Sequence, residues 1–212
     1  MYIPPHFEEA RVEVMHELIR ARPFATLVTL SASGLNANHI PLHLSLEAGS
    51  LGILRGHVAR ANPVWQDLLA GTDALAIFQG PDSYVTPSWY PTKRQDGKVL
   101  PTWNYAVVHA SGPLRVFDDP VWLRAQLEIL TTQHEASRSE PWAVSDAPPK
   151  FTESRIGAIV GIEISIGKLT GKWKLSQNQA AQNRAGVVLG LKEKGDADAL
   201  EMAALIESNS EK

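Results

Sequence analysis

Apolar residues recur every three to four positions in two parts of the chain, a spacing typical of amphipathic helices. The first part covers residues 8–21 and is followed by the helix-ending Pro23. The second begins after Asp119, a suitable N-cap, with Pro120 in its first turn. The positions expected to be buried on these two helices are Val12, Met15, Leu18, Ile19, Leu123, Leu127 and Leu130. The tail from residue 177 is typical of two helical pieces that separate near residues 194–195.

Elsewhere apolar residues alternate with polar ones or form short β-branched runs, as in strands. Segments with this pattern are 24–30, 40–46, 51–58, 74–79, 84–89, 104–117 and 160–166. Turns are expected at 33–34 and 48–50, and a short helix over 63–69 behind the N-cap Asn62. Pro41 donates no hydrogen bond, which predicts a place at a sheet edge or bulge.

These strands are joined mainly by hairpins and do not alternate regularly with helices. The pattern predicts a mainly β protein with peripheral helices (α+β), built on an antiparallel barrel rather than on a parallel doubly wound sheet. A small barrel fills its interior with side chains. A sizeable ligand is therefore expected at its mouth, on its outer face or at a subunit interface.

The composition is that of an ordinary globular protein, with 44% apolar and 20% charged residues in a chain of 212. A net charge of −3 does not favour a generic polyanion binder. The absence of cysteine excludes disulfides, thiolate metal sites and cysteine nucleophiles. No apolar run is long enough to span a membrane, and residues 1–11 do not resemble a secretion signal, so a cytoplasmic protein is expected.

Residues 78–105 are the richest candidates for ligand contacts. They carry aromatic rings in two clusters, with small hydroxyl side chains between them: Tyr84, Trp89, Tyr90, Trp103, Tyr105, Ser83, Thr86, Ser88 and Thr102. Rings can stack on a flat ligand, and hydroxyls can bond to its polar edge. Ordinary core and loop packing explains the same pattern, so both interpretations stay open.

The sequence GHVARANP at residues 56–63 lies where a strand gives way to a helix. Arg55 and His57 share one strand face, and Arg60 lies just beyond them. Such a group can hold a phosphate through charge-assisted hydrogen bonds. A helix cap with surface arginines is the alternative, because the spacing matches no established phosphate loop.

The histidines do not predict a metal site. His39 and His43 share a strand face, but no third ligand accompanies them. His109 falls in an apolar strand and is expected to be an interior histidine. No residue is identified as catalytic, since the chain has no GxSxG sequence and no evident acid or base.

Residues Lys168–Lys194 are rich in basic residues and include one acid, Glu193. This stretch is a candidate for DNA contact. Two alternatives remain: a solvated surface, or a cover over a cofactor in which Trp173 and the neighbouring amides take part.

Six motifs in order resemble the PaiB family of FMN-binding negative transcriptional regulators. They are IPPHF (3–7), NHIPL (38–42), GHVARANP (56–63), FQGPDSYVTPSWY (78–90), PTWNYAVVHASG (101–112) and KLSQN (174–178). The resemblance covers nearly the whole chain. It implies an antiparallel split β-barrel of the FMN-binding type, acting as a homodimer with FMN in the groove between subunits. The expected domains are a split barrel over 1–170 and a C-terminal helical extension over 171–212 that packs on the barrel or on the dimer partner.

The same resemblance implies roles for individual residues. Arg60 and His57 are expected to contact the FMN phosphate, with Arg55 near them. Residues bordering or closing the flavin site are expected to be Thr26, Val28, Thr29, His39, Ser88, Trp89, Thr102, Trp103 and Asn104. The C-terminal substrate-binding signature of pyridoxamine-phosphate oxidases is missing, so vitamin B6 oxidation is not implied.

Two other functions stay open at this point. One is an FMN-dependent oxidoreductase, a flavin or quinone reductase or a haem-degrading enzyme, that uses NADH or NADPH. Rapid anaerobic bleaching of bound flavin by either nucleotide would favour that enzyme over a regulator. The other is a purely structural barrel that has lost its cofactor.

Overall fold

The computed structural model describes residues 1–46, 51–66 and 72–210. The helices and strands in chain order are β1 (Glu8–Glu9), α1 (Val12–Ala21), β2 (Phe24–Ser31), β3 (Gly34–Pro41), β4 (His43–Ser45), β5 (Ile53–Ala59), β6 (Asp73–Val85), β7 (Thr102–Phe117), α2 (Pro120–Glu135), α3 (Pro149–Ile156), β8 (Ile159–Ser165), β9 (Lys168–Lys174), α4 (Ala181–Lys194) and α5 (Ala197–Ser210). Short 3₁₀ turns lie at Pro5–Phe7, Pro63–Trp65, Pro87–Trp89, Pro91–Arg94 and Val144–Asp146.

The chain forms two compact units, each assembled from segments far apart in the sequence. The β unit consists of residues 19–78 and 109–169, and the terminal unit of residues 1–18, 79–108 and 170–212. Strands β6 and β7 each contribute residues to both units. The expected division of the chain at residue 170 stays a prediction.

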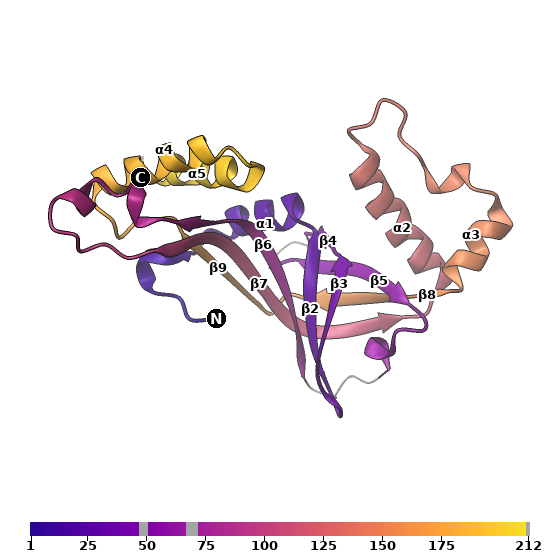
Figure 1. The fold of residues 1–212 in the computed structure, drawn as a ribbon. Helices are drawn as coiled ribbons and strands as arrows, with labels where there is room; N and C mark the ends of the chain where they lie inside the picture. The colour runs from indigo at the N-terminus through magenta and orange to yellow at the C-terminus, as the bar shows by residue number, and fades with distance from the viewer. Residues whose placement is uncertain (47–50, 67–71, 211–212) are drawn as a thin grey trace. The chain divides into compact units, whose positions relative to one another are not determined.

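The β unit is an open antiparallel sheet. Its strands pair in the order β3-β2-β6-β7-β8-β5-β4, so β3 and β4 are the ends of this path among the described residues (Figure 1). The two end strands follow each other in the chain, separated by Leu42, whose N–H donates to the Pro23 carbonyl at 2.9 Å. Pro41 is the last residue of β3, which confirms its predicted place at an edge. The predicted mainly β, antiparallel split-barrel class is confirmed.

Side chains on one face of this sheet form the core of the β unit. Every second residue along a strand points inward, and these inner residues are apolar and almost fully buried. They include Ala25, Leu27, Leu44, Leu54, Val58, Ala74, Ala76, Ala110, Val160, Ile162 and Ile164. Each large side chain buried in this way contributes about 1.5–3 kcal/mol to folding. The inner face is therefore filled, and the outer face carries the polar side chains.

Helix α2 of the β unit lies against the outer face of β5 and β8, and α3 packs against α2 and β8 (Figure 1). Helix α2 starts at the predicted cap, where Asp119 Oδ1 accepts a hydrogen bond from the Val121 N–H at 3.0 Å. Trp122 in its first turn stacks on Phe117, with 4.5 Å between the ring centroids. The same indole lies over Gly161 of β8, where an added Cβ would come within 2.3 Å of it. The absence of a side chain at residue 161 therefore lets α2 approach the sheet.

In the terminal unit, β9 pairs with β7 and with the short strand β1. Helices α4 and α5 pack against each other, joined through Gly195 in the left-handed conformation, with φ of 74°. The Gly195 N–H donates to the Leu191 carbonyl at 3.1 Å and ends α4. The predicted break near residues 194–195 is confirmed.

Several predicted elements differ from the structure. The first helix begins at residue 12 rather than 8, because the buried Glu9 carboxylate accepts a hydrogen bond from the Arg11 N–H and holds the chain extended before it. The strand predicted over 84–89 is wrong beyond residue 85, since Pro87 starts a 3₁₀ turn capped by Thr86. Helix α3 and strand β9 were not predicted. The turn at 48–50 and the end of the helix at 67–69 lie outside the described residues.

The close approach of Trp122 to residue 161 makes a test of this packing. Gly161→Ala should lower the free energy of unfolding by about 1–3 kcal/mol, because the new methyl group overlaps the indole. Urea unfolding of the purified protein measures the change. Gly157→Ala is the matched control, since its nearest neighbours would be 3.6 Å from the added carbon, and it should be close to neutral. Equal stability of the two variants would contradict the packing described.

Candidate functional site

The first group of predicted flavin residues lies on the hairpin of β2 and β3 in the β unit. Thr26 and His39 are direct cross-strand partners, and Val28 follows on the same outer face. Thr29 points the other way and is buried. Thr26, Val28 and His39 can thus offer side chains to a ligand on the outer face, whereas Thr29 can offer only its backbone.

The second group lies on the outer face of β5, next to α2. Arg55 donates from Nε to Glu163 Oε2 of β8 at 2.8 Å. His57 Nδ1 donates to Gln126 Oε1 of α2 at 2.9 Å. Arg55 and His57 are thus both oriented by side chains of neighbouring elements. This orientation is what a charged ligand group needs, because little conformational freedom remains to be lost on binding.

Gln126 is the least satisfied polar residue of this group. Its side chain is 3% exposed, and its Nε2 is buried with no hydrogen-bond partner among the described residues. A buried donor without a partner costs about 1–3 kcal/mol. An acceptor oxygen beside His57, such as one of a phosphate or a flavin, would satisfy it. The donors present on this face therefore fit an anionic, oxygen-rich cofactor such as FMN.

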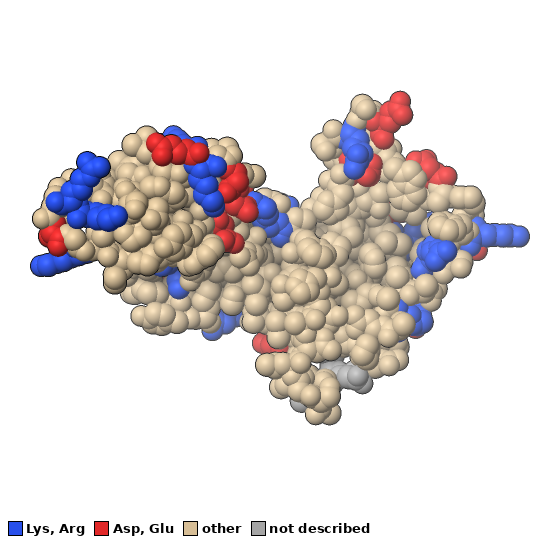
Figure 2. Space-filling model, in the orientation of Figure 1, with Lys and Arg blue, Asp and Glu red and all other residues tan. Residues whose placement is uncertain are grey.

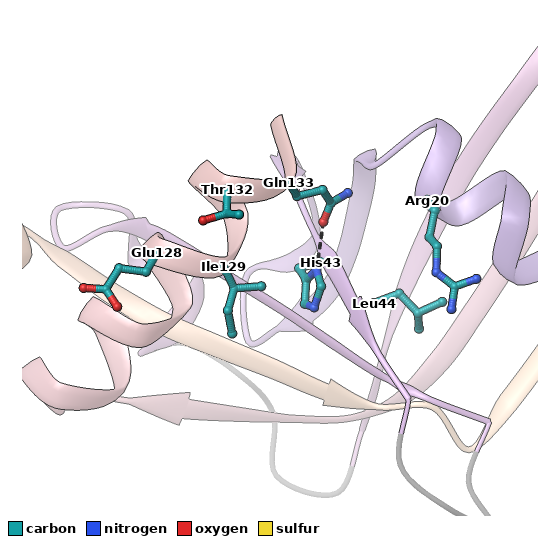
Figure 3. A pocket seen from close by; sticks show the side chains of 7 residues that line it. All are labelled: Arg20, His43, Leu44, Glu128, Ile129, Thr132 and Gln133. Atoms are coloured by element: carbon teal, nitrogen blue, oxygen red, sulfur yellow. Dashed lines mark hydrogen bonds between the residues drawn. The ribbon is translucent and has the colours of Figure 1, made fainter. Parts of the chain in front are cut away.

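A cavity of about 680 Å³ opens beside this face, between β4, α2 and the end of α1 (Figure 3). Its apolar lining includes Leu44 and Ile129, and Arg20 and Glu128 extend along its sides. His43 Nδ1 donates to Gln133 Oε1 at 2.8 Å inside it, which repeats the contact of His57 with Gln126. The volume falls within the range of ligand pockets in proteins.

Arg60 lies at the end of β5 and is held by groups of the β unit itself. Its guanidinium donates to both carboxylate oxygens of Asp118, at 2.9 and 2.5 Å, and to the carbonyls of Gly157 and Ile159. The hydrogen bonds to Asp118 raise the pKa of Arg60, and the same contact lowers the pKa of Asp118 below 3.8. A phosphate at Arg60 would have to compete with this carboxylate, so the predicted phosphate role of Arg60 stays a prediction.

The third group of predicted residues lies in the terminal unit, and only part of it gathers at a cavity. Thr102 and Asn104 of β7 line a cavity of about 380 Å³. Asn104 is fully buried and exchanges hydrogen bonds with Ser176 at 2.9 and 3.2 Å. Lys174 donates to Thr102 Oγ1 and, at 2.9 Å, to the Trp103 carbonyl. The side chains of four sequence motifs, 3–7, 78–90, 101–112 and 174–178, meet at this cavity.

Ser88, Trp89 and the Trp103 ring have other surroundings in the same unit. The Trp89 indole packs on Gly190 of α4, where an added Cβ would lie 2.2 Å away. Ser88 Oγ accepts a hydrogen bond from Lys93 at 3.2 Å. The Trp103 ring is 54% exposed and meets Tyr84 edge-on, with 6.0 Å between centroids. Trp89 thus holds α4 in place, and its predicted flavin contact stays untested.

The sequence interpretation missed Gln126 and Asp118. The apolar spacing placed Leu127 in the buried stripe of α2, but Leu127 is half-buried and the neighbouring Gln126 takes the inward position. A glutamine three residues after Leu123 and four before Leu130 was the available signal. Asp118 stands beside the helix cap Asp119, and nothing in its sequence environment distinguishes it as the partner of Arg60.

The basic side chains of residues 168–194 differ in their surroundings, since some form ion pairs and one is buried. Lys192 pairs with Glu207 at 2.7 Å, and Lys194 with Asp196 at 3.0 Å. Lys172 is buried, with its ammonium 5.2 Å from the centre of the Tyr105 ring. On the face shown in Figure 2, basic and acidic side chains lie side by side over α4 and α5. Acids thus partly balance the positive charge of this stretch.

The structure also bears on metals and membranes. Within residues 1–46, 51–66 and 72–210, no three His, Asp or Glu side chains gather as a metal site would require. Over the same ranges, no helix has both the length and the apolar character needed to cross a bilayer.

Comparison with known proteins links this chain to FMN. Residues 1–168 match the model of the family described as "Putative FMN-binding domain". The protease synthase and sporulation protein PAI 2 of Bacillus subtilis is 32% identical over 212 residues, covering 100% of this chain and 99% of that protein. An uncharacterised protein of Emericella nidulans is 37% identical over 230 residues, with 92% of each chain covered.

Solved structures share the fold at low identity. The FAD and heme binding protein of Mycobacterium smegmatis has a TM-score of 0.59 at 18% identity, covering 84% of this chain and 78% of that one. A flavocytochrome of Azotobacter vinelandii has a TM-score of 0.60 at 13% identity, covering 87% of this chain and 78% of that one. Both confirm the split-barrel architecture.

Proposed function

Because this chain belongs to the FMN-binding family whose model matches residues 1–168, we propose that it acts as a homodimer that binds FMN between its subunits and serves as a PaiB-type transcriptional regulator. FMN is the cofactor, and the flavin supplies the redox chemistry once bound. The protein's own part is to bind and orient it. One observation carries this proposal: Thr26, His39, Arg55 and His57 all lie on the outer face of strands β2, β3 and β5.

In this proposal the outer face of the β unit is the cofactor surface. Arg55 supplies positive charge and hydrogen-bond donors for the phosphate, His57 is proposed to contact it from the same strand face, and Arg60 lies next to them at the end of β5. Gln126 Nε2, which has no hydrogen-bond partner among the described residues, supports it, because a ligand oxygen beside His57 would complete the hydrogen bonding of this amide. The hairpin of β2 and β3 offers backbone and hydroxyl groups to the edge of the flavin ring.

The homodimer is supported by apolar side chains on the same outer face. Phe24 is 66% exposed, and the cross-strand pair Leu30 and Leu35 is 36% and 80% exposed. Apolar side chains that gather on one face of an edge hairpin are typical of a subunit interface. A second copy of this chain is the proposed partner, since its matching face would cover these residues and border the FMN.

The regulatory role rests on similarity to the PaiB type and on the whole-chain match to the PAI 2 protein. Direct DNA contact, if it is the route of regulation, is proposed for the Lys168–Lys194 stretch. Lys192 and Lys194 of α4 are half-exposed even in their ion pairs and can exchange acid partners for phosphates.

Arg60→Ala tests the phosphate contact. A charge-assisted hydrogen bond contributes about 1.5–3 kcal/mol, so the variant should bind FMN about tenfold to a hundredfold more weakly. Titration of flavin fluorescence with the apoprotein measures the affinity. Asp118→Asn is the matched control, because it removes the competing carboxylate and should leave FMN affinity unchanged or raise it. Unchanged affinity in Arg60→Ala would remove this residue from the site.

Leu35→Glu tests the dimer. A carboxylate at this position would be buried without a partner in the interface, so the variant should be monomeric by light scattering while the wild type is dimeric. It should also lose FMN affinity if the second subunit borders the cofactor. Val121→Glu, at a residue 77% exposed on α2, is the control and should remain a dimer. A monomeric wild-type protein would overturn the shared site.

The salt dependence of DNA binding tests the proposed contact. If Lys192 and Lys194 meet phosphates, replacing both by alanine should lower the slope of log affinity against log salt by about two. Electrophoretic mobility shifts at several salt concentrations give the slope. Lys150→Ala on α3 is the control. A wild-type affinity that does not change with salt would exclude direct contact through this stretch.

A further inference from the structure

The cavity of the terminal unit is formed by segments that lie far apart in the sequence. Phe7, Tyr90, Asn104 and Lys174 reach it from the N-terminal turn, the segment after β6, strand β7 and strand β9. Its volume of about 380 Å³ is within the range of small-molecule sites. The residues that it takes from 174–179 lie beyond residue 168, where the match to the FMN-binding family ends.

Tyr90 lines this cavity and carries a hydrogen-bond donor that the described part of the protein does not use. The residue is 3% exposed, and its hydroxyl is buried with no hydrogen-bond partner among the described residues. Burial raises the pKa of Tyr90, so the phenol keeps its proton at neutral pH. A protonated hydroxyl in this position can donate to an acceptor inside the cavity.

Lys174 adds a positive charge with donor capacity to spare. Two of its ammonium hydrogens are accounted for by Thr102 Oγ1 and the Trp103 carbonyl, and an ammonium group has three. Burial, and then the neighbouring Lys172, lower the pKa of Lys174. An anion in the cavity would oppose this lowering, because it stabilises the charged ammonium. Lys98 also lines the cavity, and among the described residues that line it there is no Asp or Glu.

The remaining walls suit a small carbon skeleton. Phe7 and Val99 contribute apolar surface, and Pro101 lies beside them. A site with cationic and hydroxyl donors against apolar walls recognises a molecule with one anionic end and a compact apolar body. A metal cation does not fit it, because the charged groups present are lysines.

We propose that this cavity binds a small organic anion, whose carboxylate or phosphate oxygens accept hydrogen bonds from the Tyr90 hydroxyl and the Lys174 ammonium. Arg55, His57 and Arg60 do not line this cavity, whereas the predicted flavin contacts Thr102 and Asn104 do, so a titration of FMN-saturated protein decides whether the ligand is separate from FMN. In a flavin-binding regulator, such a site would give the protein a second chemical input.

Isothermal titration of the full-length, FMN-saturated protein tests the proposal with three probes. Benzoate and phenyl phosphate carry the two candidate oxyanions on the same ring, and benzamide is the neutral control. We expect at least one anion to bind in the millimolar range or tighter, with benzamide at least about tenfold weaker. The better of the two anions identifies the class of the natural ligand. Flavin fluorescence followed in the same titration should stay constant.

Tyr90→Phe is the decisive variant, because it removes only a hydroxyl that has no partner in the protein. Its stability to urea should match or exceed that of the wild type, since an unsatisfied buried group is lost. Its affinity for the anion should nevertheless fall about tenfold to a hundredfold. Lys174→Met should abolish binding, and Lys168→Met, at the start of the same strand, should leave it unchanged.

Four results would overturn the proposal. One is the absence of heat with both anions up to millimolar concentrations. The second is equal binding of benzamide, and the third is unchanged affinity in Tyr90→Phe. The fourth is release of FMN by the probes, which would place them in the flavin site instead. A failure to bind FMN at all would appear separately, before any probe is added, and would bear on the cofactor proposal alone.

Discussion

The alternation of side chains along the strands of the β unit determines where its chemistry can lie. Leu27, Leu54 and Ile162 represent an inner face that is fully packed, so no ligand of useful size can enter there. Polar residues one position away, such as Arg55, His57 and Glu163, must therefore project outward. Helix α2 then meets polar side chains on this face, and its glutamines bond to histidines of the sheet. In the described part of this sheet, the packed inner face leaves the outer surface free to hold a cofactor.

Much of this arrangement follows from local patterns that the sequence displays directly. Strand alternation predicted β2, β5 and β8, and the caps Asn62 and Asp119 were predicted because a single side chain bonds to its own backbone nearby. Contacts between residues that are far apart in the chain produce no such local pattern in the sequence. The pairing of Arg60 with Asp118 joins residues 58 positions apart, and neither residue type indicates which partner it will have. Strand β9 was missed because Lys172 in it is buried beside Tyr105, which periodicity cannot reveal.

The contacts of Arg60 show why a motif does not fix a role. An arginine at the end of a strand, before a helix cap, is a reasonable phosphate ligand from sequence alone. Here its guanidinium also joins the end of β5 to Asp118 and to the carbonyls of Gly157 and Ile159. Such an arginine can support the fold, the cofactor or both, because its five donors outnumber the groups that it meets in the chain. Affinity and stability must therefore be measured separately in its variants.

Unsatisfied buried groups give the most direct physical indication of ligands in this molecule. Among the described residues, Gln126 Nε2 and the Tyr90 hydroxyl are the buried side-chain atoms without a hydrogen-bond partner. Each costs about 1–3 kcal/mol, a large fraction of the 5–15 kcal/mol by which a domain is usually stable. Phenylalanine or leucine at these positions would avoid the cost. One of these atoms belongs to Gln126, the partner of His57 in the proposed phosphate site, and the other to Tyr90, which lines the cavity of the terminal unit. Both groups are satisfied if each donates to a bound molecule, so that the folded protein carries the cost only while its ligand is absent.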